Sequence, residues 1–194
     1  MILKLALVVA MLAAVIPLRV GDELPSASFV DQSGRPFTFA SQQGKYVFLA
    51  FIYTRCKDAD ECPLVSAHVA QLQNRLDAGT RLVEVTIDPA YDKPAVLAAY
   101  AKTYGFRSDR VSLLTGDPRA VLDFAAALGV RTFDDPKYGF VHGENAILVD
   151  PRGKVAEIFE GNTWTTDEVV SVVTHLRNRP PNFWEWLLKE LGRH

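Results

Sequence analysis

Two cysteines, Cys56 and Cys62, are the only thiols in this 194-residue chain, and five residues separate them. A pair this close can form a disulfide if the two Cα atoms approach to about 4.4–6.8 Å, or it can share a soft metal ion. Two cysteines are too few to hold together a disulfide-stapled scaffold. The pair is therefore either incidental or specialised for redox chemistry or metal binding.

The residues around the cysteines set the chemistry expected of each thiol. Pro63 begins a helical pattern, so Cys62 lies at a helix N-terminus, where free N–H groups and the helix dipole stabilise a thiolate. We therefore expect the helix N-terminus to stabilise the thiolate of Cys62 more than that of Cys56. Asp58, Asp60 and Glu61 lie between the cysteines, and their charges should raise the thiol pKa values. Such acids disfavour peroxide chemistry but add to the attraction for a cation.

A soft site with two thiolates suits Cu(I) and usually takes an imidazole as its third ligand, and the chain has four histidines. His68 lies in the thiol-bearing helix beside its apolar face, and we expect it to be structural. His175, late in the last helix, and the C-terminal His194 are expected to have no role in the chemistry. His142 lies before a predicted core strand, in a loop bracketed by glycines, where α/β sheets gather ligands. From the sequence around it alone, His142 fits a metal ligand and an ordinary loop histidine equally well.

The elements that position these groups alternate between strands and helices. The segment YVFLAFIY, residues 46–53, predicts a strand buried on both faces, and the thiol loop follows it directly. The helix that begins at Pro63 carries an apolar stripe of Val65, Val69, Leu72 and Leu76. The other predicted elements are a hairpin at 28–39, strands at 81–87, 111–114, 145–150 and 154–159, and helices at 94–104, 118–128 and from Thr165. This order predicts an α/β sheet, parallel at its centre and finished by an antiparallel hairpin.

The two ends of the chain differ from the domain between them. The first eighteen residues carry one charge and then an apolar run of fourteen residues, shorter than the roughly 20 needed to span a bilayer. We expect residues 1–19 to be a signal peptide or an uncut membrane anchor, and the alternative is a buried element of the domain. Residues 179–194 predict a C-terminal amphipathic helix that folds back on the domain, and the alternative is an interfacial membrane helix.

Composition limits the partners. The formal net charge is −2 and the chain contains no block of Lys or Arg, so we expect no nucleic acid partner. With 48% hydrophobic residues the chain has enough apolar material for one core.

The ordered strings FIYTRC, CPLVSAH, IDPAYDKP and VHGENAILVDPRG resemble the Sco/SenC family of thioredoxin-like copper proteins, over roughly residues 20 to 177. The resemblance implies a single thioredoxin-like domain at 20–178, with a mixed central sheet flanked by helices. It also implies one copper ion, as Cu(I) or Cu(II), bound by Cys56, Cys62 and His142. Members of the family deliver copper to the CuA centre of cytochrome c oxidase, or keep the cysteines of that centre reduced.

The same resemblance implies where the protein acts and with what. We expect an exported protein, periplasmic or anchored to the outer face of the cytoplasmic membrane. The expected partners are the CuA-containing oxidase subunit or another periplasmic cysteine protein, with a thioredoxin-like reductant. Asp88, in IDPAYD, is the expected tuning residue near the thiols, although an Asp-Pro step also simply turns a chain.

One departure from the family keeps other functions open. The commonest family spacing is Cys-x3-Cys-Pro, whereas five residues separate the cysteines here, and Lys57 stands where longer-loop relatives have proline. A looser site would bind copper more weakly, so the alternative is a periplasmic thiol-disulfide reductase that acts without metal. A zinc site and a partner-binding module around Trp164 are further alternatives. The sequence lacks the Cys-x-x-Cys motif of general oxidoreductases and leaves open whether the protein is an enzyme.

Overall fold

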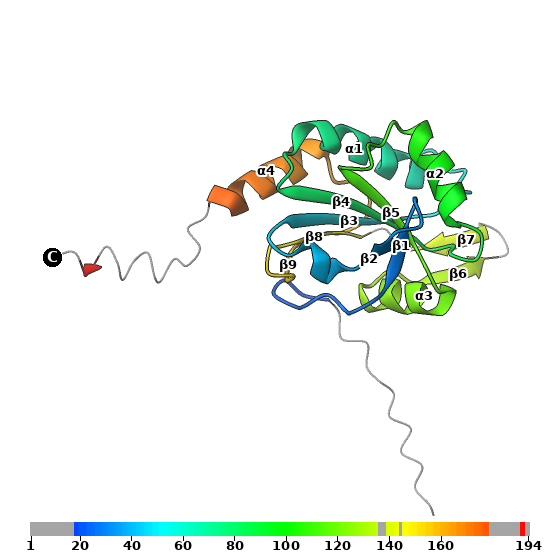
Figure 1. Ribbon diagram of the computed structural model, residues 1–194, viewed down its shortest axis with the longest axis horizontal. Coiled ribbons are helices and arrows are strands. Elements are labelled where there is room, and N and C mark those ends of the chain that lie inside the picture. The colour runs from blue at the N-terminus through cyan, green and yellow to red at the C-terminus, as the bar shows by residue number, and fades with distance from the viewer. Residues whose placement is uncertain (1–17, 136–138, 144, 179–190, 193–194) are drawn as a thin grey trace, which may run out of the picture.

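A seven-stranded mixed sheet forms the centre of the computed structural model, which describes residues 18–135, 139–143, 145–178 and 191–192 (Figure 1). The strand order is β2-β1-β5-β4-β3-β8-β9, and β6 and β7 form a separate two-stranded ribbon. The strands are β1 (Phe29–Asp31), β2 (Pro36–Phe37), β3 (Tyr46–Ile52), β4 (Thr80–Thr86), β5 (Val111–Thr115), β6 (Thr132–Asp135), β7 (Gly139–His142), β8 (Ala146–Val149) and β9 (Val155–Phe159). The helices are η1 (Phe39–Gln42, a 3₁₀ turn), α1 (Cys62–Arg75), α2 (Pro94–Thr103), α3 (Pro118–Ala127) and α4 (Thr166–Asn178).

The centre of the sheet is parallel, as the sequence predicts. β3, β4 and β5 run in the same direction, with Phe48 opposite Leu82 and Leu82 opposite Val111. β8 pairs antiparallel with β3, β9 pairs antiparallel with β8, and β1 pairs antiparallel with β5. Because β3 and β4 are parallel neighbours, the loops that follow them leave the same edge of the sheet. Those two loops are the thiol loop and the IDPAYD segment.

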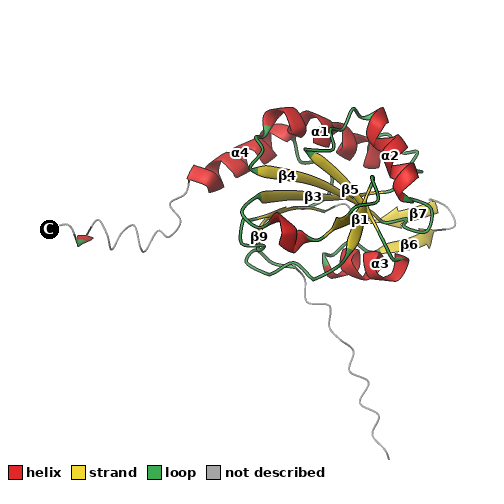
Figure 2. Cartoon of the chain, in the orientation of Figure 1, coloured by secondary structure: helices red, strands yellow, loops and turns green. Residues whose placement is uncertain are grey.

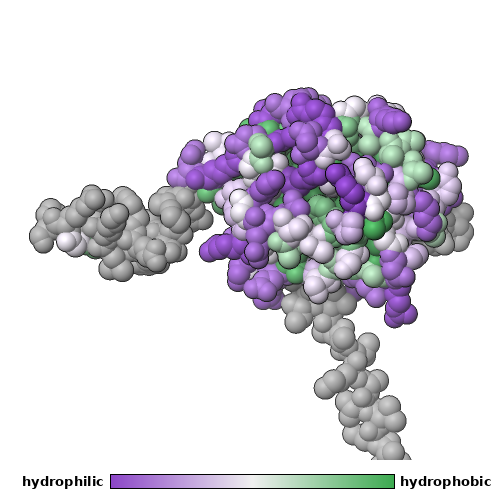
Figure 3. All heavy atoms as spheres, in the orientation of Figure 1, coloured by the Kyte–Doolittle hydropathy of each residue, from purple (hydrophilic) through white to green (hydrophobic). Residues whose placement is uncertain are grey.

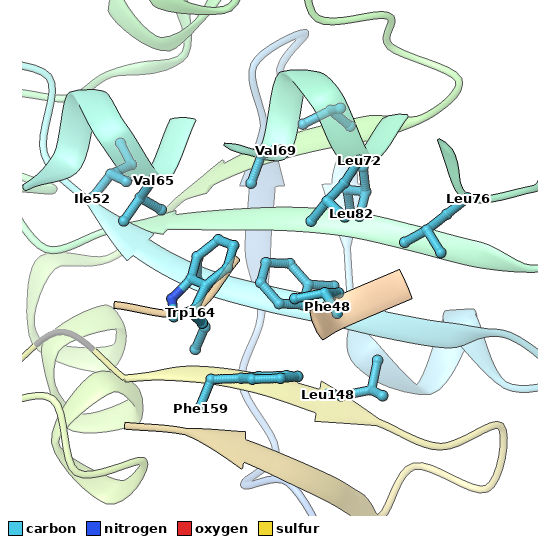
Figure 4. Close-up of a cluster of buried hydrophobic side chains, with 14 of the residues drawn as sticks. Phe48, Ile52, Val65, Val69, Leu72, Leu76, Leu82, Leu148, Phe159 and Trp164 are labelled. Atoms are coloured by element: carbon cyan, nitrogen blue, oxygen red, sulfur yellow. The ribbon is translucent and has the colours of Figure 1, made fainter. Parts of the chain in front are cut away.

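Helices cover both faces of the sheet (Figures 1 and 2). The cluster on one face joins β3 and β4 to α1, α2 and α4, and the cluster on the other face joins the sheet to α3 and β1. The predicted apolar stripe of α1 is buried in the first cluster, against Phe48 and Leu82 (Figure 4). Burying each large apolar side chain contributes about 1.5–3 kcal/mol. Hydrophilic residues cover most of the outer surface in the view of Figure 3.

The ribbon β6–β7 and the turn η1 are elements that the sequence pattern did not predict. The region around His142 was expected to be a loop, but His142 is the last residue of β7 and pairs with Thr132. Strand propensity is low at Asp134 and Asp135, which explains the missed prediction. The ribbon is held instead by its cross-strand hydrogen bonds.

The expected leader and C-terminal helix fall almost entirely outside the described residues, at 1–17 and 179–190. Within the described part of the chain, no helix is long and apolar enough to cross a membrane.

Candidate functional site

The two thiols lie side by side where β3 gives way to α1. Cys56 is half-buried in the loop after β3, and Cys62, the first residue of α1, is 1% exposed. A hydrogen bond joins the two side chains. The two candidate cysteines that are separate in the sequence therefore form one unit in the fold.

The pair is chemically asymmetric. The hydrogen bond from Cys62 lowers the pKa of the Cys56 thiol to about 6 against the opposing effect of burial, and hydrogen bonds from the backbone of Cys62 and Asp58 act in the same direction. For Cys62 the same side-chain hydrogen bond and deep burial raise the pKa far above its ordinary value, and the charge of Glu61 adds to this. Cys56 is thus the first thiolate and Cys62 keeps its proton.

This asymmetry corrects the expectation that Cys62 gains most from the helix N-terminus. The backbone N–H of Cys62, the first residue of α1, hydrogen-bonds to the sulfur of Cys56 instead, and Cys62 itself is deeply buried. As expected, the charge of the acid Glu61 helps to raise the pKa of Cys62. The pKa of Cys56, in contrast, is lowered overall.

Tyr53 is a site residue that the sequence pattern placed only at the end of a predicted strand. Its side chain hydrogen-bonds to Cys56, and this contact lowers the pKa of the thiol. Burial, followed by the same hydrogen bond, raises the pKa of Tyr53 itself. The phenol therefore remains a donor throughout the range in which Cys56 is ionised. Position gave the only available signal, since Tyr53 is the last residue of the predicted strand 46–53 and the thiol loop follows it directly.

A buried carboxylate holds the loop that carries Cys56. Asp92 is 0% exposed and lies in the segment after β4. It accepts from the backbone N–H of Thr54 at 3.1 Å, from the Thr54 hydroxyl at 2.5 Å and from the Thr86 hydroxyl at 2.5 Å. The contacts bind the exits of β3 and β4 to each other just ahead of the thiols. Asp92 lies four residues after Asp88 in IDPAYD, and the sequence pattern does not single it out.

Asp88, the predicted tuning residue, contacts the residue that precedes Cys56. It accepts from Arg55 Nε at 3.0 Å and from Arg55 Nη2 at 2.5 Å, and Arg55 is the residue before Cys56. The Arg55 guanidinium also lies over the ring of Tyr91, with 4.3 Å between its Cζ and the ring centroid. This exposed ion pair supports the loop more weakly than the buried Asp92 contacts do.

Acidic groups face the thiols from the loop between them. Glu61 Oε2 lies 3.7 Å from Cys56 Sγ, and the carbonyl oxygen of Asp58 lies 3.8 Å from the same sulfur. Asn162 Nδ2 donates to the carbonyl of Asp60 at 2.7 Å and ties this loop to the segment before α4. The soft sulfur donors suit a soft cation, and the nearby carboxylate of Glu61 adds electrostatic attraction for it.

The connection from β7 to β8 runs close to the thiols. Asn145, at the start of β8, lines a cavity of about 10 Å³ together with Cys62. Gly143 donates to the carbonyl of Arg131 at 3.2 Å, and a Cβ at Gly143 would lie 3.2 Å from the Gly129 carbonyl oxygen. Glycine therefore allows this connection to pack tightly. The side chain of His142 lies outside the described residues, so its distance from the sulfurs is left to experiment.

The structure also describes the side chains of His68 and His175. His68 is half-buried, its ring centroid is 5.0 Å from that of Trp164, and burial lowers its pKa. His175 is exposed on α4. Within the described residues, no group of three His, Cys, Asp or Glu side chains has the arrangement of a metal site. A cavity of about 790 Å³ around the segment 23–28 and the start of α3 contains neither thiol.

Comparisons with known proteins agree on one family. A family model described as SCO1/SenC matches residues 22–178. The SCO1 protein homolog of Bacillus subtilis is 31% identical over 155 residues, which cover 71% of this chain and 79% of the relative. A solved structure of BsSco, described as a member of the Sco family of cytochrome c oxidase assembly proteins with a disulfide switch, has a TM-score of 0.69 and 27% identity over 84% of this chain and 99% of that one. Yeast Sco1 with copper bound, 22% identical with a TM-score of 0.67 over 92% of this chain and 96% of that one, shares the fold.

Proposed function

Because this chain belongs to the SCO1/SenC family, we propose that it carries one copper ion to the CuA centre of cytochrome c oxidase. Copper is the cargo of this reaction. Copper is bound in the structure of yeast Sco1, and cytochrome c oxidase assembly is the stated role of the BsSco family. The proposed ligands are the sulfurs of Cys56 and Cys62 and the imidazole of His142.

The observation that carries this proposal is the adjacent, asymmetric thiol pair. Cys56 has a pKa of about 6 and is partly accessible, so it offers a ready thiolate to an arriving cation at neutral pH. In this cycle Cys62 gives up its proton when the charge of the bound metal ion compensates for its burial. Two thiolates and an imidazole are a donor set that Cu(I) favours, and the nearby carboxylates add attraction for it.

Release is proposed to occur by ligand exchange at the exposed sulfur. Acceptor thiolates displace Cys56 first, because it lies nearer the surface, and Cys62 last. Oxidation of the pair to a disulfide would remove both sulfur donors, so copper loading would depend on the redox state of the protein.

A second function, thiol-disulfide reduction without metal, is favoured by the same asymmetry. The Cys56 thiolate attacks one sulfur of an acceptor disulfide and expels the other sulfur as a thiolate. Cys62 then loses its proton to solvent and attacks Cys56, which forms the internal disulfide and releases the acceptor as a dithiol. Two electrons pass from the protein to the acceptor, and a thioredoxin-like reductant restores the pair.

The remaining parts of the proposal concern the ends of the chain and the support of the loop. We assign residues 1–19 to export or anchoring at the outer face of the cytoplasmic membrane, and residues 179–194 to a C-terminal helix that folds back on the domain. Asp88 is assigned a positioning role through Arg55.

The test is a titration of the reduced protein with Cu(I) against a competing chelator. We expect one-to-one binding that is lost in the Cys56→Ser/Cys62→Ser double variant and weakened in His142→Ala, with His175→Ala as the matched control on the exposed face of α4. Unchanged affinity in His142→Ala would remove His142 from the site. Weak binding by the unmodified protein, together with reductase turnover that needs both cysteines, would favour the second function.

A further inference from the structure

The cavity of about 790 Å³ lies at the edge of the sheet opposite the thiols. It is lined by residues at the start of β3 and the end of β8, whereas the thiol loop follows the end of β3. Its volume falls in the range of roughly 300–1,000 Å³ that binding sites have. Much of its lining is apolar and comes from Leu24, Ala27, Phe39, Ala40, Val47 and Val149. Several apolar side chains can therefore be buried in this cavity.

The end of α4 lies near this cavity, on the other side of the Tyr46 ring. Arg177, in the last turn of α4, has its Cζ 5.7 Å from the ring centroid of Tyr46. Burial and then the charge of Asp150 raise the pKa of Tyr46. The charges of Arg177 and Arg152 oppose that rise, so both guanidinium groups lie near the phenol. Because Asp150 and Arg152 line the cavity, the chain leaves α4 within reach of it (Figure 1).

The segment that follows α4 carries an apolar stripe that needs a cover. Residues 179–190 and 193–194 lie outside the described residues, and their sequence is the basis of this step. Leu191, whose side chain the structure describes, is 64% exposed. Apolar residues recur at helical spacing, with charged residues between them, at Phe183, Trp184, Leu187, Leu188 and Leu191. A stripe of this kind makes a stable helix only when it packs on an apolar surface.

The connection between α4 and the stripe has the length and composition to turn the chain. Residues 179–182, RPPN, span up to about 14 Å when extended. Pro180 and Pro181 disfavour a continuation of α4, and Asn182 is a favoured N-cap residue ahead of Phe183. A second helix can therefore begin beside the cavity instead of extending α4.

The N-terminal leader fits the cavity less well than the C-terminal stripe. It also ends nearby, because the segment 23–28 forms one wall of the cavity. Its run at 5–18 is apolar on every side, which suits a fully apolar environment. The cavity instead carries exposed polar residues such as Gln43 and Lys45 beside its apolar lining. A helix with one apolar and one polar face matches that arrangement.

We propose that residues 183–191 form an amphipathic helix whose apolar stripe fills this cavity. The inference rests on the proposed assignment of residues 179–194 to the domain, and it names the surface that binds them. The docked helix covers the edge of the sheet where β3 begins. It leaves the thiol loop, at the opposite edge, open to a partner protein.

Hydrogen exchange of the reduced, metal-free full chain, followed by mass spectrometry of its peptides, tests this docking. A helix of about nine residues is marginal in water by itself, so slow exchange in 183–191 reports packing. We expect these amides to exchange at least roughly 10-fold more slowly than in the unfolded chain. Ala120→Arg, which places a large charged side chain in the cavity from an exposed position of α3, should remove this protection. Ala99→Arg, at an exposed position of α2 that does not line the cavity, is the matched control and should leave it unchanged.

A reciprocal pair of variants tests the other side of the contact. Leu188→Glu, in the stripe, should speed exchange in the segment 38–47, which contributes to the cavity wall, and Lys189→Glu, outside the stripe, should not. Equal exchange of this segment in the two variants would contradict docking in the cavity.

The remaining outcomes separate this inference from the proposals it rests on. Protection of 183–191 that survives Ala120→Arg would overturn the inference and keep the assignment of this segment to the domain. Exchange of 183–191 at the unfolded rate would overturn both. Protection that needs anionic lipid vesicles, that is lost on dilution, or that Ala120→Arg removes from 1–17 instead would overturn the inference in favour of a membrane interface, a second copy or the leader. The Cu(I) titration tests copper binding independently of all these results.

Discussion

Glu84 provides the sharpest prediction about stability, because it is an ionisable group in the middle of the sheet. It lies in β4 between Ala50 of β3 and Leu113 of β5 and is 0% exposed. Neither carboxyl oxygen has a hydrogen-bond partner among the described residues. Burial raises the pKa of Glu84 to about 8, against a smaller opposing effect of the Ser66 hydroxyl. The folded protein therefore holds this carboxyl in its neutral form over most of the physiological range.

The sign of the effect follows from the two pKa values. The unfolded chain releases this proton near the ordinary value of 4.5, whereas the folded chain keeps it up to about pH 8. Between these limits the folded state binds one more proton, so the free energy of unfolding falls as pH rises. Each pH unit changes the free energy of unfolding by about 1.4 kcal/mol, and the whole interval by about 5 kcal/mol as an upper limit. That is a large part of the roughly 5–15 kcal/mol that stabilises a typical domain.

The perturbation is Glu84→Gln, which keeps the shape of the side chain and cannot ionise. Urea unfolding of the reduced, metal-free protein is measured at pH 5, 6.5 and 8. The stability of the variant relative to the unmodified protein should increase as pH rises, by roughly several kcal/mol at pH 8. Glu160→Gln, at an exposed position, is the matched control and should show no such trend. A constant difference between Glu84→Gln and the unmodified protein across the three pH values would refute the reasoning.

Two further predictions concern the thiol loop. Alkylation of the reduced protein should modify Cys56 first, with an apparent pKa of about 6, and Cys62→Ala should raise that value because the hydrogen bond from Cys62 is lost; an unchanged rate-against-pH profile would contradict the assigned asymmetry. Asp92→Asn should cost about 1–3 kcal/mol of stability in urea unfolding and weaken metal binding, because the buried contacts to Thr54 lose their charged acceptor. Asp88→Asn, at an exposed ion pair, should lower the free energy of unfolding by less than about 1 kcal/mol. Equal losses of stability in Asp92→Asn and Asp88→Asn would contradict the greater weight given to the buried contacts.

Local patterns in the sequence predicted most of the fold because they report burial directly. The continuous apolar run of β3 predicts a strand buried on both faces, and the stripe from Val65 to Leu76 has the period of a helix; each is buried as expected. The ribbon ending at His142 was missed because its stability comes from cross-strand pairing, which a single segment does not encode.

The chemistry of the site was harder to predict because it depends on contacts between distant segments. The sequence located both cysteines but reversed their roles, since the pKa of Cys56 depends on which sulfur receives the hydrogen bonds at the start of α1. Asp92 and Glu84 were missed for the same reason. The carboxylate of Asp92 accepts hydrogen bonds, whereas the carboxyl oxygens of Glu84 have no partner among the described residues, and only the fold shows this difference.

The most direct test of the central claim is X-ray absorption at the copper edge of the full chain loaded with one equivalent of Cu(I), beside His142→Ala treated in the same way. The account predicts two sulfur scatterers and one nitrogen scatterer in the unmodified protein, and loss of the nitrogen in the variant. Identical spectra from the two proteins, or a site with fewer than two sulfurs, would contradict binding by Cys56, Cys62 and His142.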